Sequence, residues 1–328
     1  MLRRQWLHRC AGWGLGMALL AAPWMGAQAQ ALSDKPMRIV VPFGAGGVAD
    51  VTARIVAQQL SAQLGQSVVI ENKPSAGGIV AADSVVRSAA DGHTLFLMSN
   101  GSAVTVNMFK QLPFDMVKDL MPVSTLGYFD IGVVADASAP FQSVADVVQF
   151  AQAHPGQLNI GSINVGSTQH LAAELFKSTA GLDAHIIPFN GTPAVTTALR
   201  GKQVDVAVEI LAPITGQIQS KALKLLAVTG AQRSALLPGV ATAQEQGVEG
   251  FVASSWNALA VPAGTPADVV ARLNAAIVAA VQHPDVVQKL RTQHVQAQAS
   301  TPAEAAELLR SEIAHWGQVI EAAQIPKQ

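Results

Sequence analysis

The sequence has little of three things on which common protein classes depend: cysteine, aromatic side chains and charge. Cys10 is the only cysteine among 328 residues, so neither an intramolecular disulfide nor a multi-cysteine metal site can form. Charged residues make up 13% and aromatic residues 5% of the chain, unlike the basic stripe of a nucleic-acid-binding protein, and we expect no nucleic acid among its partners. Hydrophobic residues make up 50%, which excludes intrinsic disorder and suffices for the cores of two domains.

The sequence also lacks the familiar catalytic and metal-binding signatures. It contains no Gly-x-Ser-x-Gly elbow, no His-Glu-x-x-His pair and no phosphate-binding loop that ends in Lys-Ser or Lys-Thr. The histidines are scattered without the spacing of metal ligands. We therefore expect no metal, no cofactor and no enzymatic activity, with one alternative that arises from the first glycine-rich loop below.

The first 29 residues have the layout of a secretory signal peptide. A positively charged N-terminal region with three arginines precedes an apolar run at residues 10–25, and Ala27-Gln28-Ala29 is a cleavage signature. The pair Arg3 and Arg4 also resembles a twin-arginine export signal. We expect a periplasmic mature protein. Removal of residues 1–29 takes away the three arginines and no acid, which changes the formal net charge from −1 to −4.

Short β-rich runs alternate with helical patterns along the mature chain. Two amphipathic helices, at residues 51–64 and 169–180, are followed by Gly65 and Gly181, which suit left-handed C-caps. Strands that alternate with helices predict an α/β fold with largely parallel sheets covered on both faces. Strands are expected at residues 38–43, 68–71, 94–98, 130–134, 158–161, 185–189, 204–209 and 223–229.

The C-terminal part is predicted to be helical. Thr265 and Thr301 each precede a proline and stand three residues before an acid. This pattern is typical of a threonine N-cap with proline at the first helical position.

A glycine-rich loop follows the first predicted strand and opens a helix. Its backbone can approach an anion closely, and the helix N-terminus behind it is partly positive. Gly44-x-Gly46-x-x-Ala49, with Glu71 further on, also fits a dinucleotide fingerprint, which would make the protein an exported NAD-binding α/β enzyme. Pro42 lengthens the turn that the fingerprint keeps tight, so we favour a smaller anion. Candidate ligand-binding residues here are Phe43, Gly44, Ala45, Gly46, Gly47 and Asp50, with Asp50 expected first of all to cap the helix.

A second loop of the same kind precedes the helix at residues 169–180. Both loops fall at the carboxyl edge of a strand, where open α/β sheets bind ligands. Backbone N–H groups and small hydroxyls at such a place suit a carboxylate. Candidate ligand-binding residues here are Ser162, Asn164, Val165, Gly166, Ser167, Thr168 and His170, with His170 expected to pack or to cap more than to bind.

Further candidates follow other predicted strands. Thr192 is expected to cap a helix that Pro193 begins, and Glu209 ends a strand where it would meet a protonated group or solvent. The candidate residues of this third set are Ala76, Asn100, Phe189, Asn190, Gly191 and Glu209.

Several stretches, taken in order, resemble the Bug or TctC family of extracytoplasmic solute-binding proteins, the substrate receptors of tripartite tricarboxylate transporters. They cover essentially the whole mature chain: residues 38–43 with Gly46, Gly47 and Asp50; 71–74 with 76–78; 112–115 with 118–120; Gly166 with 170–171 and 174–176; 226–229; and 261–266.

The resemblance implies a two-lobed, type II-like periplasmic binding protein with mixed sheets and a ligand cleft between the lobes. Lobe one would span residues 30–130 and 252–328, and lobe two residues 131–251. The implied ligand is a small carboxylate, either a dicarboxylate or a phthalate-like aromatic acid, and the implied partners are membrane permease subunits. We expect a monomer. A carboxylate sensor for a signalling partner is the alternative within binding proteins.

The chain departs from the usual pattern of this family at three places. The common Tyr-Lys-Gly is Phe189-Asn190-Gly191 here, the common strand-end aspartate is Glu209, and the common Pro-Gly-Ala-Gly-Gly is Pro74-Ser75-Ala76-Gly77-Gly78. The hypothesis that Phe43, Phe189 and Trp256 make the cleft suited to an aromatic ligand rests on residue type alone.

Overall fold

The computed structural model describes residues 35–328. The predicted signal peptide, residues 1–29, lies outside the described residues. The strands are β1 (Met37–Val41), β2 (Val68–Asn72), β3 (Thr94–Ser99), β4 (Leu120–Asp136), β5 (Leu158–Ile163), β6 (Ala184–Phe189), β7 (Val206–Ile210), β8 (Leu223–Val228), β9 (Ser254–Pro262) and β10 (Val295–Ala297).

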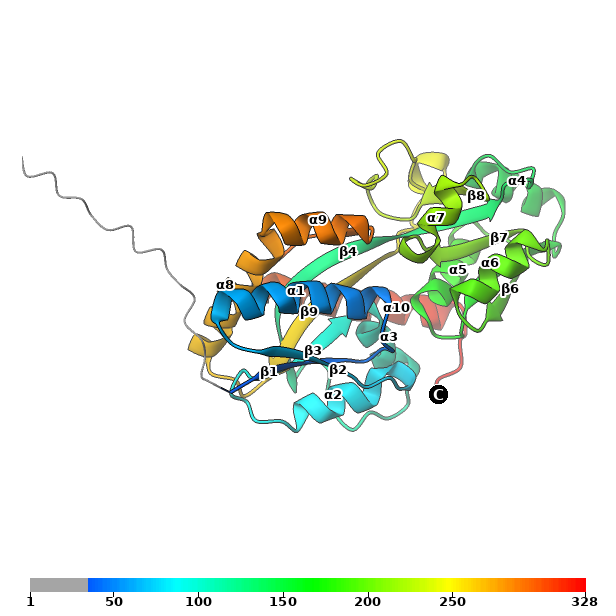
Figure 1. Cartoon of the computed structure of the whole chain (residues 1–328). Coiled ribbons are helices and arrows are strands. Elements are labelled where there is room, and N and C mark those ends of the chain that lie inside the picture. Colours follow the sequence, from blue (N-terminus) through cyan, green and yellow to red (C-terminus); the bar gives the residue numbers. More distant parts are fainter. Residues whose placement is uncertain (1–34) are drawn as a thin grey trace, which may run out of the picture.

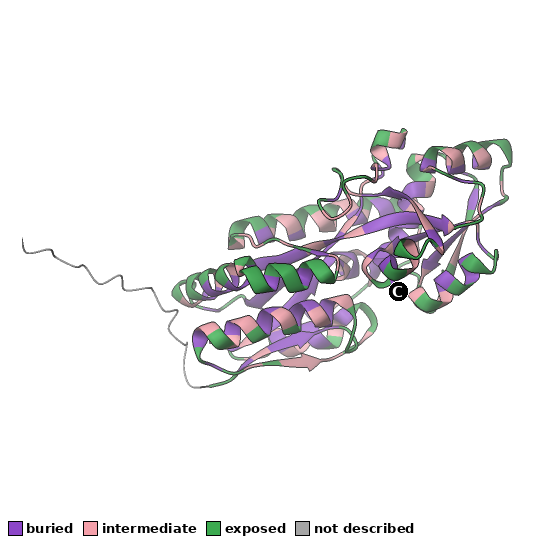
Figure 2. Cartoon of the chain, turned by 45° about the horizontal axis from the view of Figure 1, so that its top comes forward, coloured by how far each residue is buried: buried purple, intermediate pink, exposed green. Residues whose placement is uncertain are grey.

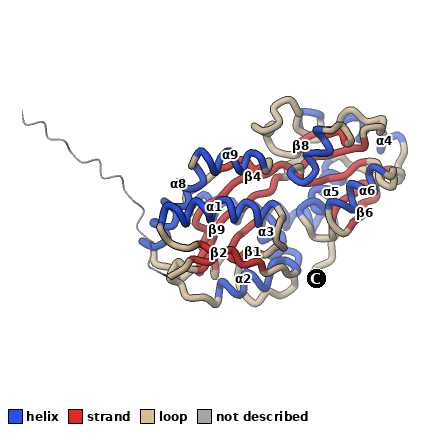
Figure 3. Tube along the Cα trace, in the orientation of Figure 1, coloured by secondary structure: helices blue, strands red, loops and turns tan. Residues whose placement is uncertain are grey.

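Helices follow nearly every strand of the described chain, as Figures 1 and 3 show. The α-helices are α1 (Val48–Leu64), α2 (Ile79–Val86), α3 (Asn100–Met108), α4 (Val144–Ala153), α5 (Thr168–Thr179), α6 (Thr192–Arg200), α7 (Thr215–Gln219), α8 (Ala267–Gln282), α9 (Pro284–Thr292) and α10 (Pro302–Ala322). Short 3₁₀ turns are η1 (Ala76–Gly78), η2 (Ala212–Ile214) and η3 (Gln244–Gln246).

The strands form one mixed sheet in the order β2-β1-β3-β9-β4-β7-β5-β6, with β8 and β10 also paired to β4. β1 is parallel to β2 and β3, and β5 is parallel to β6 and β7. β9 runs antiparallel to β3 and β4, and β4 runs antiparallel to β7 and β8. The predicted α/β fold with a mixed sheet is confirmed.

The long strand β4 joins the two halves of the molecule (Figure 1). It pairs with β9 as far as Asp130 and with β7 from Ile131 onward. We call the part with β1, β2, β3, β9 and β10 lobe one, and the part with β5, β6, β7 and β8 lobe two. The exact lobe limits expected from the sequence, at 130/131 and 251/252, stay a prediction.

The sequence predicted only residues 130–134 in the second half of β4, and neither β9 nor β10. The first half of β4 contains Pro122, Ser124 and Gly127, and its register with β9 shifts at two points. Almost every residue of β9 is buried, so it shows no alternation of polar and apolar residues. A strand of this kind forms because of its neighbours, and its own pattern does not reveal it.

Helices cover both faces of the sheet, and the strands are the most buried part of the chain in Figure 2. Helices α1, α8 and α9 pack against one face of lobe one, while α2, α3 and α10 cover the other. Helix α10, red in Figure 1, also contacts α5 of lobe two. The C-terminal helix therefore connects the cores of both lobes.

The helix ends test the capping predictions. Gly65 and Gly181 are left-handed, with φ of 61° and 60°, and Thr301 forms a capping box with Glu304 at the start of α10, so these are confirmed. The cap predicted at Thr265 is wrong. Pro266 is the N-cap of α8, and the Thr265 hydroxyl donates to the Pro262 carbonyl instead, at 2.8 Å.

Candidate functional site

A cavity of about 600 Å³ lies between the lobes and draws its lining from both. A shallower groove of about 640 Å³, around Thr196 and Arg200, belongs to lobe two only, so we take the first as the candidate ligand cleft. Its lining comprises Pro42, Phe43, Gly47, Val48, Ala49, Ser75, Ala76, Gly77, Gly78, Ser99, Gly101, Ser102, Val104, Thr105, Met108, Phe109, Phe129, Ile163, Asn164, Val165, Gly166, Ser167, Thr168, Gln169, Thr192, Ile210, Pro213, Ser255, Asn257 and Gln328.

Helix N-termini from both lobes meet at this cleft. The N-caps of α1, α3 and α5 are Gly47, Ser99 and Ser167, and all three line the cleft. The first N–H groups of a helix have no intrahelical partner and carry partial positive charge. None of the lining side chains drawn from residues 35–328 is charged. The site therefore offers an anion backbone dipoles and hydroxyls in place of a lysine or arginine.

In lobe one, Asp50 holds the glycine-rich loop in place. Its Oδ2 accepts the Gly46 N–H at 2.8 Å and pairs with Arg54 Nε at 2.9 Å, while Asn72 Nδ2 donates to its Oδ1 at 2.9 Å. Burial would raise the pKa of Asp50, but these hydrogen bonds outweigh it and lower the pKa. Asp50 is buried and is not the N-cap of α1. It orders the loop beside the cleft and is not part of the lining.

Other members of the first loop divide between the cleft and solvent. Phe43 and Gly47 line the cleft, whereas Gly44, Ala45 and Gly46 are exposed outside its lining. Glu71, the acid of the possible dinucleotide fingerprint, forms two salt bridges. Its Oε2 pairs with Arg38 at 3.0 Å and its Oε1 with Lys73 at 3.1 Å.

In lobe two, Asn164, Val165, Gly166, Ser167 and Thr168 line the cleft. The hydroxyl of Ser167 is already engaged, because it accepts the His170 N–H at 3.1 Å and donates to the Ile163 carbonyl at 3.1 Å. The N–H groups of Thr168 and Gln169, the first two of α5, remain as the donors that can meet a ligand.

We expect Ser167→Ala to act mainly on stability. Loss of the N-cap should lower the free energy of unfolding by about 0.5–2 kcal/mol, as measured by urea denaturation. Ser178→Ala in the same helix, where the hydroxyl only donates to the Leu175 carbonyl, is the matched control and should change stability by less than about 0.5 kcal/mol. Equal stability of both variants would show that the Ser167 cap is unimportant.

A buried hydrogen-bond chain links the lobes next to the cleft. Asn100 Nδ2 of α3 donates to Thr168 Oγ1 of α5 at 3.2 Å, and Trp316 Nε1 of α10 donates to Asn100 Oδ1 at 2.7 Å. Asn100 and Trp316 are fully buried. Asn100 does not line the cleft itself, but it fixes Thr168, which does.

Two lining residues that sequence reasoning missed carry unpaired polar atoms. Ser99 Oγ and Asn257 Oδ1 are buried without a hydrogen-bond partner in the described chain, and their residues lie opposite one another on β3 and β9. Buried polar atoms of this kind call for a partner. Ser99 follows a predicted strand and could have been found from that position. Asn257 lies on β9, which the sequence did not reveal.

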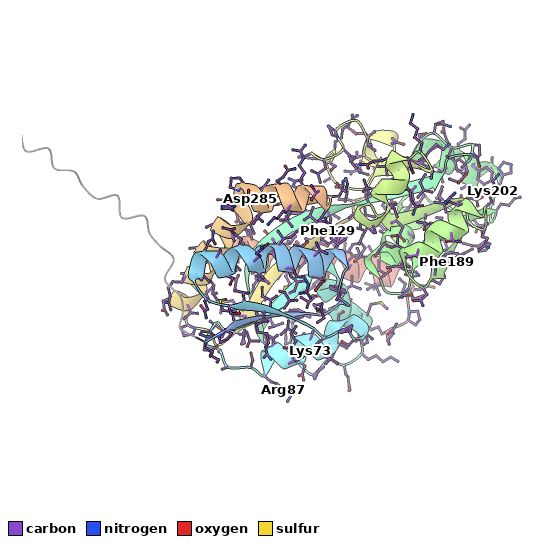
Figure 4. The ribbon with its side chains drawn as sticks, viewed as in Figure 1. Lys73, Arg87, Phe129, Phe189, Lys202 and Asp285 are labelled. Carbon is purple, nitrogen blue, oxygen red and sulfur yellow. The ribbon has the colours of Figure 1, made fainter. Side chains whose placement is uncertain are left out.

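The aromatic lining differs from the hypothesis. Phe43 lines the cleft and is 39% exposed. Trp256 is buried outside the lining, and Phe189 packs against the core of lobe two. Phe109 and Phe129 line the cleft instead, and Figure 4 shows Phe129 near the middle of the molecule and Phe189 out on lobe two.

Of the remaining candidates, Ala76 lines the cleft and the others lie outside the lining. Ser162 and His170 are buried, and burial lowers the pKa of His170. Asn190 is exposed. Gly191, not Thr192, is the N-cap of α6, so the cap predicted at Thr192 is wrong because its hydroxyl donates to Glu209.

The expectation that Glu209 could meet solvent is also wrong. Glu209 is fully buried, and its Oε2 accepts from Thr192 Oγ1 at 3.1 Å and from Gln169 Nε2 at 3.4 Å. Within residues 35–328, no helix is long and apolar enough to cross a membrane, and no group of three or more metal-ligating side chains is found.

Comparison with known proteins shows which protein family the chain resembles. A family model described as "Tripartite tricarboxylate transporter family receptor" matches residues 52–325. BugT of Bordetella pertussis is 32% identical over 93% of this chain and 94% of its own. An R. palustris protein solved with adipate is 31% identical, with a TM-score of 0.79 over 89% of this chain and 98% of that one. MatC from Rhodopseudomonas palustris, solved with bound malate, is 30% identical, with a TM-score of 0.74 over 87% of this chain and 98% of its own.

Proposed function

The chain belongs to the tripartite tricarboxylate transporter receptor family, a family of periplasmic solute-binding proteins and not of enzymes, and on that premise we propose that its ligand is a small carboxylate. The ligand is a dicarboxylate or an aromatic carboxylate, which the protein delivers to membrane permease subunits. The observation that carries this proposal is the convergence of α1, α3 and α5 on a cleft whose described lining holds no charged side chain.

The strength of such a site is sufficient for a transport receptor. A hydrogen bond to a charged group contributes about 1.5–3 kcal/mol. A few such bonds, after ordering costs, reach the about −8 kcal/mol of a micromolar complex. Helix N-termini from both lobes let one ligand be held from two sides.

The lining also has a large apolar share. Phe43, Met108, Phe109, Phe129 and Ile210 contribute to it. Acid groups joined by a hydrocarbon chain or a ring suit this mixture better than a compact, hydroxyl-rich acid does. Adipate and malate, bound in two related structures, both have two carboxylates and support a dicarboxylate, and adipate also has the hydrocarbon chain that the apolar lining favours.

The test is a thermal-shift screen of the purified protein with mono-, di- and tricarboxylates, aromatic acids, acidic amino acids, NAD and NADP. A ligand that binds only the native state stabilises it by about 2.7 kcal/mol at a hundredfold excess over Kd. We expect a shift with one group of acids and none with dimethyl adipate, the uncharged control. A shift with NAD alone would replace this proposal with the dinucleotide interpretation.

The proposal includes an exported monomer cleaved after residue 29. Mass spectrometry of the periplasmic fraction checks the cleavage, and size-exclusion chromatography checks the monomer. An intact N-terminus in that fraction would contradict the signal-peptide prediction.

A further inference from the structure

Glu209 occupies an unusual position beneath the lobe-two end of the cleft. It is the penultimate residue of β7 and is 0% exposed. Its two side-chain hydrogen-bond partners, Gln169 at the start of α5 and Thr192 at the start of α6, both line the cleft. The carboxyl group is therefore one side chain away from any ligand in the cleft.

The direction of these hydrogen bonds determines whether Gln169 and Thr192 offer donors or acceptors to a ligand in the cleft. Oε2 accepts from both Gln169 Nε2 and Thr192 Oγ1, while Oε1 is buried without a hydrogen-bond partner in the described chain. An ionised carboxylate only accepts, so it draws both donors toward itself. With these donors engaged, the Gln169 amide oxygen and the Thr192 hydroxyl oxygen, both acceptors, are left for a ligand.

No cation compensates Glu209 within residues 35–328. Strands β4 and β5 and helices α5 and α6 pack against β7, and none of their charged groups forms an ion pair or hydrogen bond with Glu209. The titratable groups on these elements are Tyr128, Asp130 and Asp136 on β4, His170, Glu174 and Lys177 on α5, and Arg200 on α6, with none on β5.

Both protonation states of Glu209 are therefore accessible near neutral pH. Burial raises the pKa of Glu209 to about 7, and the hydrogen bonds from Gln169, Thr192 and the Ile210 backbone offset only part of that effect. A neutral carboxyl group has a proton to donate. It can bond to the Gln169 amide oxygen and leave the hydroxyl of Thr192 and the amide of Gln169 to donate into the cleft.

We propose that Glu209 is a positioning residue that selects the ligand by its protonation state. Neutral Glu209 lets Gln169 and Thr192 donate to a ligand carboxylate. Ionised Glu209 takes those donors and favours a ligand end that is itself a donor, such as a primary amide. This inference rests on the proposed function, because it concerns one end of the same carboxylate cleft.

The sign of the pH dependence follows from linkage. An anion next to Glu209 binds best when the group is neutral, so affinity for a dicarboxylate is highest below the pKa of Glu209 and falls as pH rises through about 7. If only the neutral form binds the diacid, Kd should rise about 25-fold between pH 6.5 and pH 8.5. Binding at pH 7.5 should also take up a proton.

The experiment is isothermal titration calorimetry of the purified protein with adipate and with its monoamide, adipamic acid, at pH 6.5 and 8.5. For the unmodified protein we expect the Kd of adipate to rise at least about fivefold with pH, and that of the monoamide to change less than about twofold. Titrations at pH 7.5 in two buffers of different ionisation enthalpy should give proton uptake with adipate. A Kd for adipate that is the same at both pH values would overturn the inference.

Two variants separate Glu209 from the other acids. Glu209→Gln is permanently uncharged and keeps a donor and an acceptor, so it should bind adipate with a Kd that no longer depends on pH. Glu174→Gln removes another carboxyl group whose pKa burial raises and should keep the pH dependence. If Glu209→Gln does not fold, the pH dependence of Kd and the proton uptake of the unmodified protein still test the inference. Absence of binding by any acid at either pH refutes the proposed function, whereas binding with no change in Kd refutes only this inference.

Discussion

Replacing Gly47 with valine will abolish ligand binding, with an affinity loss of at least about 100-fold, which corresponds to about 2.7 kcal/mol. Gly47 is the N-cap of α1 and lines the cleft. Its φ of −77° is open to any residue, and the nearest atom to an added Cβ is the Gly44 carbonyl oxygen at 3.9 Å. The fold can therefore accept the side chain, while its methyl groups fill the space through which an anion reaches the first N–H groups of α1.

The measurement is titration calorimetry with the acid that the thermal-shift screen identifies. Gly216→Val is the matched control, since Gly216 lies in α7 with no atom within 4 Å of an added Cβ and is not part of the lining. It should bind as the unmodified protein does. If Gly47→Val keeps its affinity, the first loop is not the anion site.

Replacing Trp316 with alanine will lower the free energy of unfolding by about 3–5 kcal/mol, the usual cost of truncating a large buried aromatic side chain. Trp316 is 0% exposed and packs in the core that α10 shares with both lobes. Its Nε1 also donates to Asn100 Oδ1 and to Glu312 Oε2, each at 2.7 Å. The alanine leaves a cavity and two acceptors without their donor.

Trp316→Phe separates packing from hydrogen bonding. It keeps most of the apolar volume but removes the indole N–H, so the loss should be about 1–3 kcal/mol. Urea denaturation measures both variants. Ligand affinity should fall in both, because Asn100 would lose the bond that orients it toward Thr168. A stability loss below about 1 kcal/mol in the alanine variant would contradict the role of α10 as the shared core.

The described lining of the cleft offers an anion the N-termini of three helices, and none of its side chains is charged. Helix N-termini from lobe one and lobe two line the cleft, and Glu209, beneath the lobe-two end, is buried and forms no ion pair within residues 35–328. As proposed above, the protonation state of this single buried acid decides which end groups the cleft accepts.

The sequence by itself determined the features that depend on local chemistry. The alternation of strands and helices, the left-handed glycines Gly65 and Gly181, and the capping box at Thr301 follow from neighbouring residues. The family resemblance, carried by motifs spread along the chain, was likewise readable. The two loops that supply Gly47 and Thr168 to the cleft were found because each follows a strand and opens a helix.

Only the tertiary structure decided what depends on residues far apart in the chain. Strand β9 was missed because a fully buried strand has no polar-apolar alternation, and with it Asn257. The Ser167 hydroxyl forms hydrogen bonds within its own loop and helix start, with Ile163 and His170. Glu209 is buried because α5 and α6 bring Gln169 and Thr192 over it. Burial and hydrogen-bond partners are properties of the packed chain, and the same glutamate at a solvated strand end would have an ordinary pKa and no part in selecting a ligand.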